Sequence, residues 1–129
     1  MMREGPYADA SLGTTGQSLG KISQRIVGLH REFYGRGPTN AKSYLSDDLV
    51  VVMMRGGFTA AEATLLEGGR GDSVIQQRAE FQEVMGDRFR EVVEQELGRK
   101  VVATMSAIHQ HPDLLSQIFV LEATELLTD

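Results

Sequence analysis

The sequence predicts an α+β fold, a two-layer sandwich in which helices cover one face of a four-stranded, mainly antiparallel sheet. Two observations carry this prediction: helical apolar stripes at 17–34 and 74–97, and two pairs of short apolar runs that each flank a turn. The expected order is α-β-β-α-α-β-β. Because 129 residues is the usual length of one domain, we expect a single domain over residues 17–129.

The first helix is expected over residues 17–34. Its apolar stripe recurs at spacings of three and four: Leu19, Ile22, Ile26, Leu29 and Phe33. Gly35 ends the helix, since glycine adopts the left-handed conformation at little cost, and Pro38 prevents the helix from resuming. Residues 1–16 are rich in Gly, Ser, Thr and Ala, and we expect them to form a flexible N-terminal arm.

A β-hairpin is expected from residues 41–45 and 49–54, with Asp47 and Asp48 at its turn. The second of these strands is apolar at every position, although a strand with one solvated face should alternate. Both faces therefore need cover, and the second face has three candidates: the N-terminal arm, a helix or a second subunit. We predict a homodimer whose interface uses this strand: Leu49, Val50, Val51, Val52, Met53 and Met54.

Two helices and a second hairpin follow. Thr59 and Glu62 match a capping box that opens a short helix, and Asp72 or Ser73 is expected to cap the long helix over 74–97. Gly86 lies inside the long helix, where it indicates close packing. The carboxylates of this helix and its three arginines, Arg78, Arg88 and Arg90, are assigned to a solvated face. Residues 101–109 and 116–122 are the last two strands.

Composition restricts the function classes. The net charge of −5 argues against binding to nucleic acid or to anionic membranes, which requires a basic face. The absence of cysteine excludes thiolate catalysis, disulfides and cysteine zinc sites. There is no apolar run long enough for direct membrane insertion and no secretory leader, so a cytoplasmic location is expected. We identify no catalytic residue, metal site or cofactor.

The glycine loop at 35–39 has two interpretations. Its amides and Arg36 suit a small anion, but the loop follows a helix instead of preceding one, which favours a helix stop. The anion hypothesis extends to basic residues at strand ends, which would converge on one rim. The candidate anion-binding residues are Arg36, Gly37, Thr39, Lys42, Arg55, Arg99 and Lys100.

His109 and His111 are two residues apart, a spacing that places both on one face of a strand and suits a metal, with Asp113 as a third ligand. The pair nevertheless spans a turn next to Pro112. We therefore interpret it as a solvated turn and predict no metal site.

Four segments, in their order and spacing, resemble the MpsC-like family, which was long catalogued as a domain of unknown function. They are Gly-Arg-Gly-Pro-Thr at 35–39, the strand 49–54, Thr-Ala-Ala-Glu at 59–62 and Leu-Gly-Arg-Lys-Val-Val at 97–102. The resemblance runs from about Leu19 to Leu121. It implies a link to a bacterial sodium-translocating, membrane-potential-generating system, whose membrane partners are also connected to inorganic-carbon uptake.

The function expected from the sequence is therefore a non-enzymatic interaction or regulatory role in the cytosol. By resemblance, the partners would be subunits of the membrane-transport system. The alternative is a sensor domain that binds a small anion at the basic rim. An enzyme has the least support, because no nucleophile and base stand at a recognisable spacing.

Overall fold

The computed structural model describes residues 9–123, with the side chains described from residue 15 onward. Its elements follow the predicted order, and their bounds are α1 Asp9–Tyr34, β1 Asn40–Ser46, β2 Leu49–Arg55, α2 Ala60–Glu67, α3 Gly71–Leu97, β3 Val101–His109 and β4 Leu114–Leu121. Helix α1 begins at Asp9, so the boundary predicted at residue 17 is too late and part of the expected arm is helical. Residues 1–8 of that arm lie outside the described residues.

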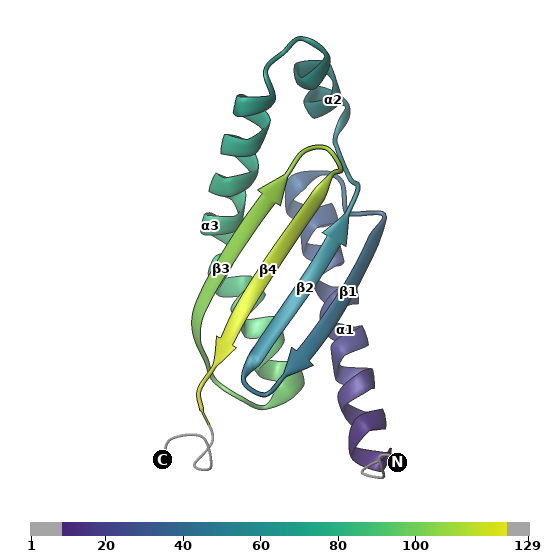
Figure 1. Ribbon diagram of the computed structural model, residues 1–129, viewed down its shortest axis with the longest axis vertical. Coiled ribbons are helices and arrows are strands. Elements are labelled where there is room, and N and C mark those ends of the chain that lie inside the picture. Colours follow the sequence, from purple (N-terminus) through teal and green to yellow (C-terminus); the bar gives the residue numbers. More distant parts are fainter. Residues whose placement is uncertain (1–8, 124–129) are drawn as a thin grey trace.

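The four strands form one antiparallel sheet in the order β1-β2-β4-β3. Each hairpin pairs internally, and β2 and β4 join the two hairpins at the centre, with Val52 opposite Gln117. The long helices α1 and α3 lie side by side on one face of this sheet, while α2 lies beyond the end of β2 (Figure 1). The α+β two-layer fold is confirmed.

The core lies between the helices and the inner face of the sheet. Every second residue of β2 points into it: Val50, Val52 and Met54 are each at most 1% exposed. Ile22 and Ile26 of α1 cover them from the other layer, together with a row of residues from α3. The period of two in the strands meets the period of 3.6 in the helices, as a two-layer core requires.

Two of the helix ends agree with the sequence prediction, and the start of α3 does not. Thr59 and Glu62 form the predicted capping box, and Gly98 takes the left-handed conformation with φ of 66° after α3. The N-cap of α3 is Arg70, which makes no side-chain cap, so the cap predicted at Asp72 or Ser73 is wrong. Helix α3 begins at Gly71 instead.

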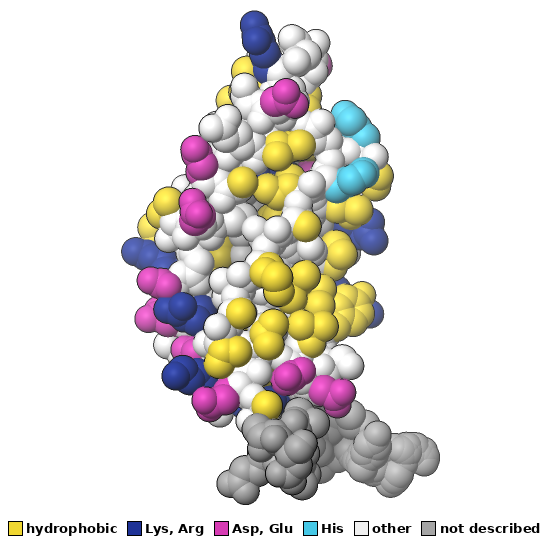
Figure 2. Space-filling model, turned by 60° about the vertical axis from the view of Figure 1, so that its left-hand side comes forward, with side chains coloured by type: hydrophobic (Ala, Val, Ile, Leu, Met, Phe, Trp, Pro, Cys, Tyr) yellow, Lys and Arg dark blue, Asp and Glu magenta, His cyan; other side chains and the backbone are white. Residues whose placement is uncertain are grey.

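The outer face of the sheet is the side away from the helices, and in the described part of the chain no element covers it. Strand β2 places Leu49, Val51 and Met53 on it, and all three retain exposed surface. Tyr44 and Met105 lie on the flanking strands and are 50% and 54% exposed. Figure 2 shows hydrophobic side chains gathered over this face, while charged side chains lie along the side of α3.

The predicted cover of β2 is thus present on the inner face, and cover of the outer face by a second subunit stays a prediction. Helices cover the inner residues Val50, Val52 and Met54, which removes these three from any interface surface. The outer residues stay apolar without cover from the described residues. In the same part of the chain, no helix combines the length and the hydropathy that a membrane crossing requires.

Candidate functional site

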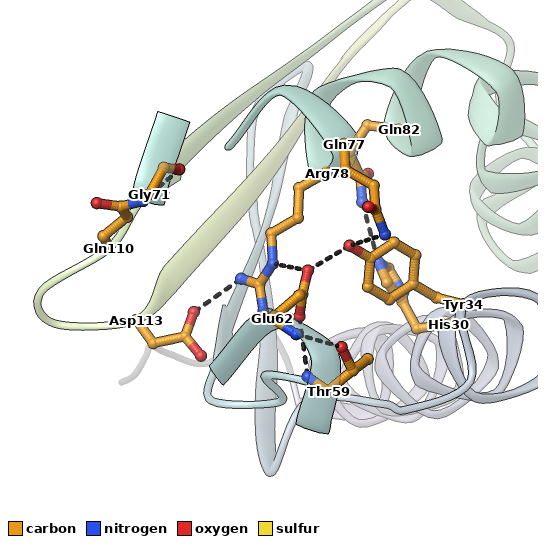
Figure 3. Close-up of polar contacts among 10 residues, drawn as sticks. All are labelled: His30, Tyr34, Thr59, Glu62, Gly71, Gln77, Arg78, Gln82, Gln110 and Asp113. Carbon is orange, nitrogen blue, oxygen red and sulfur yellow. Dashed lines mark hydrogen bonds and ion pairs between the residues drawn. The ribbon is translucent and has the colours of Figure 1, made fainter. Parts of the chain in front are cut away.

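A buried ionic cluster lies where α2, α3 and the β3–β4 turn meet. Arg78 of α3 donates from Nε to Glu62 Oε2 at 3.0 Å, from Nη2 to Glu62 Oε1 at 3.1 Å and from Nη1 to Asp113 Oδ1 at 2.8 Å. The hydroxyl of Tyr34 donates to Glu62 Oε2. Figure 3 shows Arg78 reaching from its helix between the two carboxylates. We call Glu62, Arg78, Asp113 and Tyr34 the Arg78 cluster.

Local sequence explains how each member is positioned. Glu62 is the third residue of α2, and its Oε1 also accepts from the amide of Thr59 at 2.9 Å, so the capping box fixes the carboxylate. Arg78 lies four residues after buried Val74, on the same face of α3. Its guanidinium also stacks on Phe58, 4.4 Å from the ring centroid. These contacts orient the planar guanidinium of Arg78 so that two of its N–H groups face the carboxylate of Glu62, the geometry of a bidentate ion pair.

The cluster is held in its charged form. Burial by itself raises the pKa of Glu62, but hydrogen bonds from Arg78, Tyr34 and the Thr59 amide outweigh burial and leave that pKa below its usual value. Burial would likewise lower the pKa of Arg78, and the two carboxylates more than compensate. Burial and the Glu62 carboxylate raise the pKa of Tyr34 to about 12, so its hydroxyl stays protonated at neutral pH. The cluster connects the three helices α1, α2 and α3 to the β3–β4 turn.

A small cavity of about 20 Å³ adjoins the cluster, between Tyr34, Arg36 and Arg78. One water molecule needs roughly 10–15 Å³ by the same kind of measure. The cavity therefore has room for about one water molecule and none for an organic substrate.

A second buried chain of hydrogen bonds runs from α1 through α3 to β4. His30 bonds through Nδ1 to the carbonyl of Ile26 at 2.9 Å, and a carbonyl only accepts, so Nδ1 carries the hydrogen. The amide of Gln82 donates to His30 Nε2 at 3.0 Å, and the amide of Gln117 donates to Gln82 Oε1 at 2.5 Å. Every hydrogen bond of this series is donated in the direction of Ile26. Gln117 stands at the other end of the series, and its Oε1 is an acceptor.

This arrangement predicts a dependence of stability on pH. Burial is the main cause that lowers the pKa of His30 from its ordinary value of 6.5, so the unfolded chain takes up a proton there before the folded chain does. The free energy of unfolding should therefore fall as the pH drops below about 6.5, by at most about 1.4 kcal/mol per pH unit from one group. Above that pH the contribution of His30 is fully present.

Urea unfolding between pH 7.5 and 5.5 measures this slope. The slope should shrink in His30→Gln and persist in His111→Gln, which changes an exposed histidine. An unchanged slope in His30→Gln would contradict the assignment to His30.

The model of the family described as "Na+-translocating membrane potential-generating system (MpsC)" matches residues 14–123. The chain belongs to the MpsC family. The match confirms the resemblance found in the sequence and covers α1 from Thr14 through β4. Comparison with curated proteins gave no match, and comparison with solved structures gave none either.

In this MpsC-family chain the seven candidate anion-binding residues do not form one rim. Arg36, Gly37 and Thr39 precede β1 and lie near Arg55, because the amide of Thr39 donates to the carbonyl of Arg55 at 2.9 Å. Arg99 and Lys100 precede β3 at the opposite end of the sheet, which is roughly 20 Å away at about 3.3 Å per residue.

Two of the candidates, Lys42 and Arg99, already have partners within the chain. Lys42 lies on the outer face, with Nζ 5.4 Å from the centre of the Tyr44 ring. Arg99 donates to the carbonyls of Asp47 and Glu122 at 3.0 and 3.3 Å. The convergence expected from the sequence is absent among these seven residues because the hairpins place their basic residues at opposite ends.

The glycine loop of the MpsC-family chain ends a helix. Gly35 has φ of 92°, the left-handed region expected of a helix stop. Gly37 is buried, and a Cβ there would lie 2.7 Å from Cγ of Arg31. Both the amide and the hydroxyl of Thr39 donate to the carbonyl of Arg55, so neither points to an anion. The loop sets the start of β1.

The histidine turn holds no cluster of metal ligands. His109 bonds through Nδ1 to the carbonyl of Pro112 at 2.9 Å, and Asp113 pairs with Arg78. Among the described residues of the MpsC-family chain, no group of three His, Cys, Asp or Glu side chains is placed to hold a metal ion.

The sequence interpretation missed the polar residues of the interior. It assigned Arg78 to a solvated face, yet Arg78 is only 7% exposed. The signal was present in the spacing, because Arg78 and Gln82 continue the stripe from Val74 to Met85, and His30 continues the stripe of Ile22 and Ile26. A polar residue on an apolar stripe indicates a buried partner.

Proposed function

We propose that this protein is a non-enzymatic, homodimeric interaction or regulatory protein of a bacterial sodium-translocating, membrane-potential-generating system. The observation that carries the proposal is the apolar outer face of the sheet, centred on Val51 and Met53. Membership of the MpsC family supports the link to that system. The cytosolic side is the compartment that we propose for it, given its acidic, cysteine-free composition.

The size of the outer face supports a weak, reversible dimer. The sheet has four strands, and at about 4.8 Å between strands and about 3.3 Å per residue its flat footprint is on the order of 400 Å². A standard interface buries about 800 Å² per partner. The outer face therefore provides about half of a standard interface, the size of a weak and transient contact, and we propose a dimer that dissociates at micromolar concentration.

Sedimentation velocity tests the dimer. The wild-type chain should show a dimer at tens of micromolar and dissociate on dilution, whereas Val51→Glu should stay monomeric because it places a charge at the centre of the apolar face. The matched control is Val84→Glu on α3, where an 81% exposed valine receives the same change and the dimer should persist. A wild-type monomer at tens of micromolar would overturn the homodimer.

The membrane partner is tested by affinity capture from native membranes solubilised in mild detergent. The wild-type chain should recover the membrane subunits of the sodium-translocating system, identified by mass spectrometry. Val51→Glu separates two arrangements: retained capture places the partner away from the outer face, and lost capture places it on the outer face. Recovery of no such subunit from either chain would refute the role in that system.

The interaction role has more support than an anion sensor. The residues of the expected basic rim occupy opposite ends of the sheet. In addition, Thr39 and Arg99 donate hydrogen bonds to backbone carbonyls. A sensor needs convergent donors in a shared pocket, and the cavity beside Arg36 has a volume of only about 20 Å³.

A further inference from the structure

A groove of about 290 Å³ lies between α3 and the sheet, on the side of the edge strand β3. Thr104 and Ser106 of β3 bring hydroxyl groups to it, and the buried rings of Phe89 and Phe119 line it from α3 and β4. This volume is at the low end of small-molecule pockets, which begin at roughly 300 Å³. The groove is more than tenfold larger than the cavity beside Arg78, whose volume is about 20 Å³.

Gly86 lines this groove from the middle of α3. The sequence predicted close packing there, and that prediction is wrong: a Cβ built on Gly86 meets no atom within 4 Å, counting the described residues apart from the backbone of its own helix nearby. A glycine inside a helix destabilises that helix relative to alanine. Packing within the described chain does not explain why glycine stands at this position. The open space beside it is therefore available to a ligand that enters the groove.

The buried series of hydrogen bonds ends at a residue that lines the groove. Gln117 is 4% exposed and lines the groove, and its Oε1 has no hydrogen-bond partner in the described part of the chain. The direction of the chain, set by His30 Nδ1 and passed on through Gln82, leaves this atom as an acceptor. A buried acceptor without a partner is unfavourable, so a ligand that donates a hydrogen bond there is stabilised.

The charge of the groove selects the kind of donor. Glu83 lines it, and no Lys, Arg or His is found among the described residues of its lining. A carboxylate together with an unpartnered carbonyl favours a positively charged N–H donor over an anion. The rings of Phe89 and Phe119 add an apolar surface for a short carbon chain.

We propose that the groove between α3 and β3 binds a primary ammonium group on a short alkyl chain. The ammonium donates to Gln117 Oε1 and lies near Glu83, and the alkyl chain packs into the space beside Gly86. A free aliphatic amine and a lysine side chain of a peptide share this chemistry. The proposal does not depend on the dimer, because Glu83, Gly86 and Gln117 are not outer-face residues; Met105 alone borders both the groove and the outer face.

Titration monitored by ¹H–¹⁵N NMR tests the proposal with n-butylammonium as the probe. The backbone amide of Gly86 and the side-chain amides of Gln82 and Gln117 should shift in a saturable way. Butyrate, which has the same chain and the opposite charge, should not shift them. Equal shifts with butyrate, or no saturable shift with n-butylammonium, would overturn the proposal.

Two variants test the location. Gly86→Leu fills the space and should weaken binding by about tenfold or more, the equivalent of about 1.4 kcal/mol. Gly28→Leu is the matched control, because Gly28 lies inside α1, also has no atom within 4 Å of a built Cβ, and is not in the groove lining. Glu83→Gln should weaken binding by about two- to fivefold, the worth of an exposed ion pair. Unchanged binding in Gly86→Leu would overturn the location.

A third experiment distinguishes a lysine side chain from a free amine as the natural ligand. The peptide Gly-Gly-Lys-Gly-Gly, with blocked ends, is compared with the same peptide carrying acetyl-lysine. Saturable shifts with the lysine peptide alone assign the groove to a lysine side chain, and shifts with n-butylammonium but neither peptide assign it to a free amine. Shifts of equal size with both peptides would overturn recognition of the ammonium group.

Discussion

Glu62→Gln should lower the free energy of unfolding by about 3–5 kcal/mol, the usual cost of breaking a buried ion pair from one side. The substitution keeps the shape of the side chain, and glutamine still serves in a capping box. What it removes is the negative charge opposite Arg78, whose side chain is 8% exposed. The effect therefore measures a buried guanidinium that keeps Asp113 but has lost its bidentate partner, and it leaves the helix cap in place.

Urea denaturation at pH 7 gives the value, and Glu67→Gln is the matched control on the same helix. Glu67 is exposed, so its substitution should stay within about 0.5 kcal/mol of wild type. The acid sensitivity should change as well. Because the pKa of Glu62 is lowered in the folded state, its stabilising effect is present above its unfolded pKa of about 4.5 and is lost as the pH falls further. A loss below about 1 kcal/mol in Glu62→Gln would show that the pair contributes as little as a surface pair.

Phe89→Ala should also destabilise the protein by about 3–5 kcal/mol, the range for removing a buried aromatic ring. Phe89 is 1% exposed and stacks on His30, with ring centroids 5.1 Å apart and an interplanar angle of 13°. The substitution removes the contact that packs α3 against α1 beside the buried histidine. It also leaves a cavity that the surrounding helices close only in part.

Thermal and urea unfolding of Phe89→Ala should be compared with Phe33→Ala. Phe33 is 43% exposed and packs under the guanidinium of Arg88, so its removal should cost about 1 kcal/mol or less. Equal losses in the two variants would contradict the position of Phe89 at the centre of the core.

The order of elements was predictable because each one carries a local pattern. The stripe of α1, the apolar run of β2, the Thr59 capping box and the glycines after α1 and α3 depend on neighbours within a few residues, and the structure keeps them all. The start of α1 was not predictable from the stripe, because residues 9–16 are mostly small and polar and give no amphipathic signal.

The candidate sites needed distances between residues far apart in the chain. Glu62 was found from the sequence as a cap, but its pairing with Arg78 and Asp113 joins three elements, and no local spacing indicates it. The basic residues were predicted to converge, and the antiparallel order β1-β2-β4-β3 instead separates Arg36 from Arg99 by the length of a strand. The groove at Gly86 likewise depends on how far α3 lies from β3.

The sequence by itself determined the α+β class, the order of the elements, the family and the apolar character of β2, because these follow from periodicity, capping and ordered local motifs. Only the tertiary structure decided which face of β2 is covered, which polar side chains are buried together and where a groove stays open. The physical reason is that a residue is buried only where a second element packs against it, and local sequence does not specify that packing. Val50 and Val51 are chemically identical neighbours, and only the position of the helices makes one core and the other surface.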